Sequence, residues 1–153
     1  MKRTANHNIS RSPSAFTLVE VLIVVVIMAV LAATIIPQFT NSTEDAEAST
    51  VLFNLNTMRS IIELYKSQHN GLAPSADLSE LTASTDRSGN KGTGSSYPYG
   101  PYLQKIPDNP LTDSNVVAQP TSVPPTSTVD GAGWLYDPAT GQIWINHADY
   151  LNE

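Results

Sequence analysis

The position of Glu20 is the chemical feature of this chain that most needs an explanation. Glu20 lies two residues inside an apolar run from Leu18 to Ile36, which only Glu20 itself and Thr34 interrupt. A carboxylate in an apolar environment costs several kcal/mol unless a positive group meets it. The sequence therefore predicts that Glu20 has a cationic partner.

Other side chains with chemical potential are scattered. The three histidines have no HExxH or Ser-His-Asp context, so we expect them to be solvated or structural, and no phosphate-binding loop is present. They are His7, His69 and His147. A tyrosine-rich segment, interleaved with Pro and Gly, forms either a ligand platform or, as we favour, a turn that tucks its aromatic rings inward. Its tyrosines are Tyr97, Tyr99 and Tyr102.

Three aspartates in the second half of the chain are candidate calcium ligands, because hard cations take clustered carboxylate and carbonyl oxygens. They are Asp108, Asp113 and Asp130. The chain has no cysteine. This excludes a disulfide scaffold, a thiolate metal site and a cysteine nucleophile.

The composition narrows the classes of protein. Of the 153 residues, 41% are apolar and 14% are charged, against about a quarter charged in ordinary soluble domains. Such a chain is too apolar for a disordered acidic tail. A net charge of −6 with a pI near 4.9 makes nucleic acid a poor partner.

The charge is placed unevenly around the apolar run. Residues 1–15 carry Lys2, Arg3 and Arg11 and no acid, which leaves five bases and fourteen acids, a balance of −9, for the rest of the chain. As a helix, residues 18–36 would span roughly 28 Å, close to the roughly 30 Å of a bilayer core. The positive-inside rule then predicts a cytoplasmic N-terminus and an exported C-terminal part.

Two other interpretations of this run remain open. A secretory signal also has a basic start, an apolar centre and a small-residue cleavage site, which Val30-Leu31-Ala32 or the neighbouring Ala33 would supply. A plain uncleaved membrane anchor is the other alternative. Neither interpretation explains Glu20.

The residues around Glu20 offer an explanation. The string Ser14-Ala15-Phe16-Thr17-Leu18-Val19-Glu20, between a basic leader and the apolar run, resembles the processing site of type IV pilins and type II secretion pseudopilins. In that family a membrane prepilin peptidase cuts before the Phe and methylates the new amine. The resemblance implies cleavage between Ala15, where the family usually has Gly, and Phe16.

The resemblance also implies how the subunits join. Cleavage creates a cationic amine on Phe16, which Glu20 of a neighbouring subunit neutralises when the helices stack with an axial stagger. The implied partners are further copies in a helical pseudopilus, minor pseudopilins, the prepilin peptidase and methylase, an inner-membrane platform protein, an assembly ATPase and membrane lipid. No nucleic acid, no catalytic residue and no cofactor other than calcium are expected.

A long helix is expected to carry these residues. Apolar residues recur at three- and four-residue spacing between residues 48 and 65, so the helix continues as an amphipathic segment that packs mainly against its own C-terminal domain. Gly71 is the expected stop, which gives a helix from about Phe16 to about His69. Pro37 predicts a kink or local melting where the helix leaves the bilayer.

The remaining chain reads as a small, loop-rich β domain. Residues 70–74 and 102–110 resemble pseudopilin segments. Residues 133–137 and 142–146 predict a β-hairpin with Gly141 at positive φ. Prolines exclude a central strand from residues 111–132.

These observations predict an α+β, type IV pilin-like lollipop, in which one long N-terminal helix packs on a small antiparallel β-sheet. Its parts are a leader (1–15), a transmembrane and assembly half-helix (16–39), an exposed amphipathic half-helix (40–70) and a loop-rich β domain (71–153).

The expected function is that of a structural pseudopilin of type II secretion, not an enzyme, held in the inner membrane with a periplasmic C-terminal domain and then assembled into a pseudopilus. The alternatives are a type IV pilin or minor pilin for attachment, motility or DNA uptake, and a membrane-anchored or exported binding domain that uses the tyrosine-rich turn.

Overall fold

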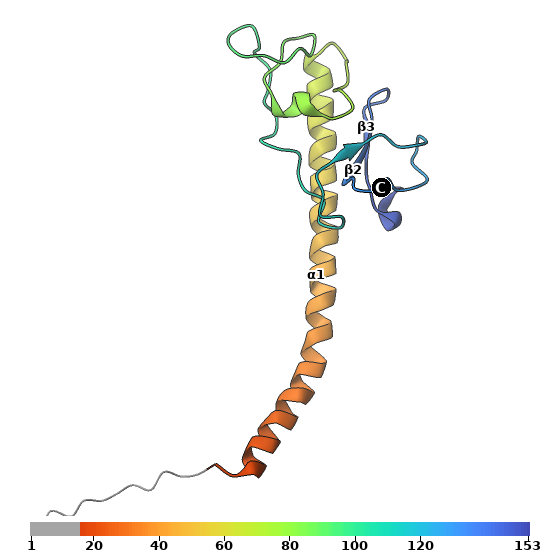
Figure 1. The fold of residues 1–153 in the computed structure, drawn as a ribbon. Coiled ribbons are helices and arrows are strands. Elements are labelled where there is room, and N and C mark those ends of the chain that lie inside the picture. The colour runs from red at the N-terminus through yellow and green to blue at the C-terminus, as the bar shows by residue number, and fades with distance from the viewer. Residues whose placement is uncertain (1–15) are drawn as a thin grey trace, which may run out of the picture. The chain divides into compact units, whose positions relative to one another are not determined.

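The computed structural model describes residues 16–153, apart from the side chains of residues 37–41. The predicted leader therefore lies outside the described residues. The chain divides into two compact units, Met1–Ser42 and Thr43–Glu153. The elements, labelled in part in Figure 1, are helix α1 (Leu18–Gln68), 3₁₀ helix η1 (Ser79–Thr82), strands β1 (Val117–Ala118), β2 (Trp134–Asp137) and β3 (Gln142–Ile145), and 3₁₀ helix η2 (Ala148–Tyr150).

Helix α1 begins and ends within two residues of the predicted bounds. Its apolar first part forms helix without tertiary support, since Leu18–Ile36 has no residue buried inside the protein. The helix continues through Pro37. The predicted local melting at Pro37 is therefore wrong, and the kink there stays a prediction.

The end of α1 is set by backbone geometry. Asn70 and Gly71 adopt positive φ angles of 58° and 82°, and the Gly71 amide donates to the Lys66 carbonyl at 2.8 Å. A left-handed residue after the last turn satisfies carbonyls that have no partner within the helix. The predicted stop at Gly71 is confirmed.

The sheet contains the predicted hairpin. β2 and β3 pair antiparallel, with Trp134 opposite Ile145, and Gly141 in the turn has a φ of 76°. The third strand corrects the prediction of a wholly antiparallel sheet, because β1 pairs with β2 in parallel, Val117 opposite Trp134. A parallel neighbour needs a long connection, and residues 119–133 provide it. β1 is an edge strand, as the prolines in this segment require.

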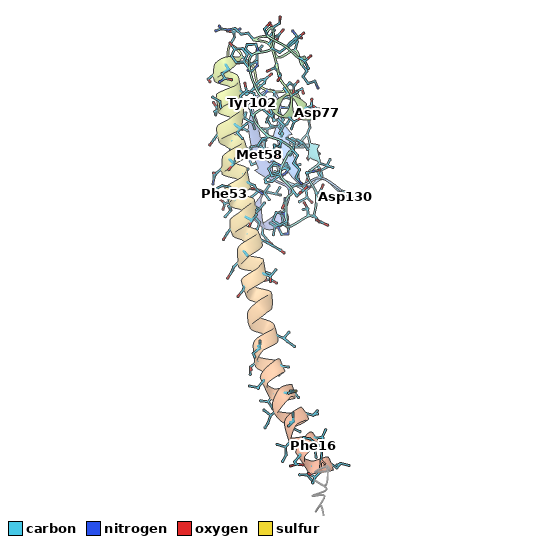
Figure 2. The ribbon with its side chains drawn as sticks, turned by 90° about the vertical axis from the view of Figure 1, so that its left-hand side faces the viewer. Phe16, Phe53, Met58, Asp77, Tyr102 and Asp130 are labelled. Carbon is cyan, nitrogen blue, oxygen red and sulfur yellow. The ribbon has the colours of Figure 1, made fainter. Side chains whose placement is uncertain are left out.

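The core of the second unit lies between α1 and the hairpin (Figure 1). Figure 2 shows Met58 on the side of α1 that faces the rest of this unit. Alternate residues of a strand point to the same face of a sheet, and the predicted inward set is buried. The expectation that each strand buries only one face is wrong, because Leu135 and Trp144, which alternate with that set, are buried as well. The core cluster consists of Val51, Leu55, Met58, Ile62, Tyr65, Leu78, Leu81, Trp134, Tyr136, Ile143 and Ile145.

Candidate assembly site

The start of α1 is organised by a reciprocal pair of side chains, Thr17 and Glu20. The Thr17 amide and the Thr17 hydroxyl both donate to Glu20 Oε2 at 2.9 Å, and the Glu20 amide donates to Thr17 Oγ1 at 3.2 Å. Thr17 immediately precedes the first helical residue, Leu18. This is a capping box, in which the residue before the helix and the third helical residue satisfy each other's backbone amides.

The capping box changes the account of Glu20. Its carboxylate accepts two hydrogen bonds from its own chain and lies in the first turn, where the helix dipole favours negative charge. Glu20 therefore has an intrachain partner before any other subunit is considered. Sequence reasoning missed the role of Thr17, although Thr-x-x-Glu ahead of an apolar run is a recognisable capping signature.

Phe16 and the apolar run are fully available for contact. Phe16 is 85% exposed, and Leu18–Ile36 has the length and hydropathy of a membrane span. Ala15 lies outside the described residues, so the cleavage site is not tested. The pairing of Glu20 with the Phe16 amine of another copy also stays a prediction.

The three candidate calcium ligands do not gather in one place. Among the described residues, no group of three or more His, Cys, Asp or Glu side chains is arranged to hold a metal ion. The carboxylate of Asp108 forms an ion pair with Lys105 at 2.5 Å. Asp130 lines a hollow of about 340 Å³ together with Thr112, whose buried hydroxyl has no hydrogen-bond partner. These carboxylates do not fit a shared calcium site, and calcium binding stays an untested prediction.

His69 has a structural role. It is buried, its ring stacks on Tyr65 at 3.7 Å between centroids, and it hydrogen-bonds the Tyr65 carbonyl and the Thr85 hydroxyl. His147 is partly exposed, with Nδ1 3.7 Å from Asp149. His7 lies outside the described residues.

The tyrosine-rich segment packs against the end of α1. The Tyr102 hydroxyl donates to Gln68 Oε1 at 2.5 Å, and the Tyr99 and Tyr102 rings meet His69 edge-on. Burial raises the pKa of Tyr102, and it raises the pKa of Tyr65 to about 12. Tyr99 and Tyr102 thus contribute to packing, as the favoured interpretation of this segment predicted.

Known proteins are similar to this chain both in the N-terminal region that holds Phe16 and Glu20 and over a longer stretch. Residues 10–36 match the family described as "Prokaryotic N-terminal methylation motif". Three relatives share the name "Type II secretion system core protein G". The protein from Klebsiella pneumoniae is 28% identical over 95 residues, which is 62% of this chain and 66% of that protein. Those from Aeromonas hydrophila and Vibrio cholerae are 27% and 28% identical over 100 residues, 65% of this chain and 68% and 66% of theirs.

The chain is similar to the major pseudopilins of type II secretion. The matches span about two thirds of each relative, and no solved structure matches comparably. The resemblance inferred from the Ser14–Glu20 string is supported by both the family match and the relatives.

Proposed function

We propose that this chain is a structural subunit, rather than an enzyme, of a type II secretion pseudopilus. Leu18–Ile36 holds it in the inner membrane, with the N-terminus cytoplasmic and the unit Thr43–Glu153 periplasmic. A prepilin peptidase removes residues 1–15 and methylates Phe16. An assembly ATPase and a platform protein then extract the subunit into a helical fibre, together with minor pseudopilins.

The observation that supports this function is a carboxylate retained inside a membrane-length apolar helix that also matches the N-terminal methylation motif. Nothing in the capping box requires a negative charge, because a neutral Gln also serves at that position. The negative charge of Glu20 can instead form an ion pair with a cationic group. The processed Phe16 amine of a neighbouring copy is such a group. Deleting one member of a buried charge pair costs about 3–5 kcal/mol.

Three variants separate charge pairing from helix capping. Glu20→Gln removes the charge and keeps an oxygen that accepts from Thr17. Thr17→Val removes the hydroxyl of the cap and keeps the charge. Glu20→Ala removes both the charge and the capping oxygen. If the pair drives assembly, Glu20→Gln and Glu20→Ala abolish fibres alike, while Thr17→Val retains them with a frayed first turn.

The assay expresses each full chain with its secretion machinery and compares sheared fibre with membrane-retained subunit. Mass spectrometry of the subunit should find an N-methylated Phe16 in every variant, which excludes a processing defect. Fibres of Glu20→Gln at the unsubstituted yield would refute the charge-pair mechanism. A mature chain that still begins at Met1, or that begins near Thr34, would refute the pseudopilin assignment.

A further inference from the structure

The connection from β1 to β2 contains a segment rich in hydroxyl groups and prolines, residues 119–128, which we call the hydroxyl loop. Its ten residues include three prolines and five Ser or Thr residues. No charged residue lies between Asp113 and Asp130, so the whole loop is polar without being charged. Segments that combine Ser and Thr with Pro in this way are typical of chains that carry O-linked sugars.

The prolines keep the hydroxyl loop out of the sheet. Proline has no amide hydrogen to donate to a neighbouring strand, and it disfavours helix in the residue before it. Residues 119–128 accordingly belong to no helix or strand, and within the described part of the chain they form no hydrogen bond between backbone groups. Because proline also fixes φ, this loop loses less conformational entropy when an enzyme grips it than a glycine-rich loop would.

The hydroxyl groups of the loop bond to one another rather than to the rest of the domain. Thr121 Oγ1 lies 3.3 Å from Ser127 Oγ, and Ser122 Oγ lies 3.1 Å from Thr126 Oγ1. Figure 2 shows Asp130, two residues after the loop, on the side of the domain away from α1. Four of the five hydroxyl residues are exposed, namely Thr121, Thr126, Ser127 and Thr128.

Hydroxyl groups elsewhere take part in the local structure. On α1, Ser49 and Thr57 donate to carbonyls of their own helix at 2.8 and 2.9 Å. After the helix, Ser75 and Ser79 donate to the Asp77 carboxylate at 2.7 and 2.8 Å. A group attached to one of these oxygens would break a hydrogen bond to a carbonyl or a carboxylate. In the hydroxyl loop, attachment at Thr121, Thr126 or Ser127 replaces only a contact with another loop hydroxyl.

The surrounding charge favours a neutral group over a phosphate. A phosphate is stabilised by nearby Arg or Lys and is repelled by acids. No Lys or Arg lies between Lys105 and Glu153, and the residues that border the loop in sequence are Asp113 and Asp130. A sugar adds no charge, and its own hydroxyls would hydrate an uncharged loop on which Val123 is 48% exposed.

We infer that the hydroxyl loop is a site of O-linked glycosylation, with the exposed hydroxyls of Thr121, Thr126, Ser127 and Thr128 as the acceptors. A glycosyltransferase supplies the sugar from an activated glycosyl phosphate. The hydroxyl oxygen forms a bond to the anomeric carbon, and the bond from that carbon to the phosphate oxygen breaks. The phosphate leaves with the electron pair, and the hydroxyl proton passes to a base of the transferase.

Mass spectrometry of the full chain, isolated from the cells that naturally make it, tests the site. Cleavage before aspartate releases residues 113–129 as one peptide. This peptide should be heavier than its sequence by one or more sugar units in most molecules, and electron-transfer fragmentation should place the sugar on the exposed hydroxyls. Trypsin releases residues 92–105, which carry the exposed Thr93, Ser95 and Ser96 in a glycine-rich loop. This control peptide should have the mass of its sequence.

Two sets of substitutions, expressed in the same cells, test the acceptors. The loop variant combines Thr121→Val, Thr126→Val, Ser127→Ala and Thr128→Val, and the control variant combines Thr93→Val, Ser95→Ala and Ser96→Ala. Periodate oxidation followed by a hydrazide dye labels the vicinal diols of sugars. The loop variant should lower dye incorporation at least tenfold, and the control variant should leave it within twofold. Both should keep the thermal unfolding midpoint of the unsubstituted chain, because the replaced side chains are exposed.

Each outcome decides for or against the inference. An unmodified 113–129 peptide, an added mass that a phosphatase removes, equal modification of residues 92–105, or dye incorporation that the loop variant retains would overturn it. Sugar on residues 113–129 that is lost in the loop variant would support it. The inference does not depend on the proposed function, since it needs only a loop that a transferase can reach. Fibres with an unmodified loop would overturn this inference alone, and a glycosylated chain that never enters a fibre would overturn the proposed function alone.

Discussion

The hydrogen bond between His69 and Thr85 should control the stability of the second unit. His69 Nδ1 lies 2.8 Å from the Tyr65 carbonyl oxygen, which only accepts, so Nδ1 carries the proton. In the neutral ring Nε2 then has a lone pair, and it accepts from the Thr85 hydroxyl at 2.9 Å. Both residues are fully buried. Thr85→Val keeps the shape of the side chain and removes the donor.

The expected loss follows from an unsatisfied buried acceptor. Leaving one costs about 1–3 kcal/mol. For a unit of about 110 residues, an unfolding entropy of about 2.1 cal/mol/K per residue converts this to a midpoint about 4–13 °C lower. Thr85→Ser keeps the donor and loses one methyl group, worth about 1 kcal/mol, so its midpoint should lie between those of Thr85→Val and the unsubstituted protein.

Thermal unfolding of fragment 43–153, followed by circular dichroism, measures these values. His69→Phe preserves an aromatic ring to stack on Tyr65 and removes the acceptor. The double variant His69→Phe/Thr85→Val should therefore lose at least about 1 kcal/mol less than the sum of the single variants, because removing both partners leaves neither unpaired. A midpoint for Thr85→Val above that of Thr85→Ser, or strictly additive losses in the double variant, would refute the assigned hydrogen bond.

Three further predictions follow from the structure. Hydrogen bonds from Ser75 and Ser79 lower the pKa of Asp77 from 3.8 to about 2. The stabilising effect of the Asp77 carboxylate is therefore present above its unfolded pKa and is lost as the pH falls from about 4 to about 2. Urea titrations should find that the free energy of unfolding of Asp77→Asn depends less on pH in this range than that of the unsubstituted protein. The full chain should require detergent, while fragment 43–153 should be a soluble, acidic monomer by size-exclusion chromatography. Cell fractionation that finds the fragment in the membrane would contradict the assigned span. Because the three aspartates do not fit a shared calcium site, EGTA and added calcium should both leave the unfolding midpoint of the fragment unchanged; a midpoint that EGTA lowers and calcium restores would contradict this conclusion.

The sequence by itself predicted the features that depend on neighbouring residues. Helix α1, its buried stripe around Met58, its end at Gly71 and the hairpin around Gly141 all follow from local periodicity or from a single backbone requirement. The membrane-length run and its embedded Glu20 are equally local. The capping box could also have been predicted from the sequence, since Thr17 and Glu20 are only three residues apart.

Tertiary structure decided what depends on residues far apart in the chain. The parallel pairing of β1 with β2 joins segments separated by a long loop that no periodicity describes. The His69–Thr85 hydrogen bond, and the fact that the three aspartates form no metal-holding group among the described residues, likewise depend on how the loops after α1 fold back. The exposure of Phe53 likewise depends on the tertiary structure, because a helical pattern states which residues share a side of the helix but not which side the rest of the chain will cover.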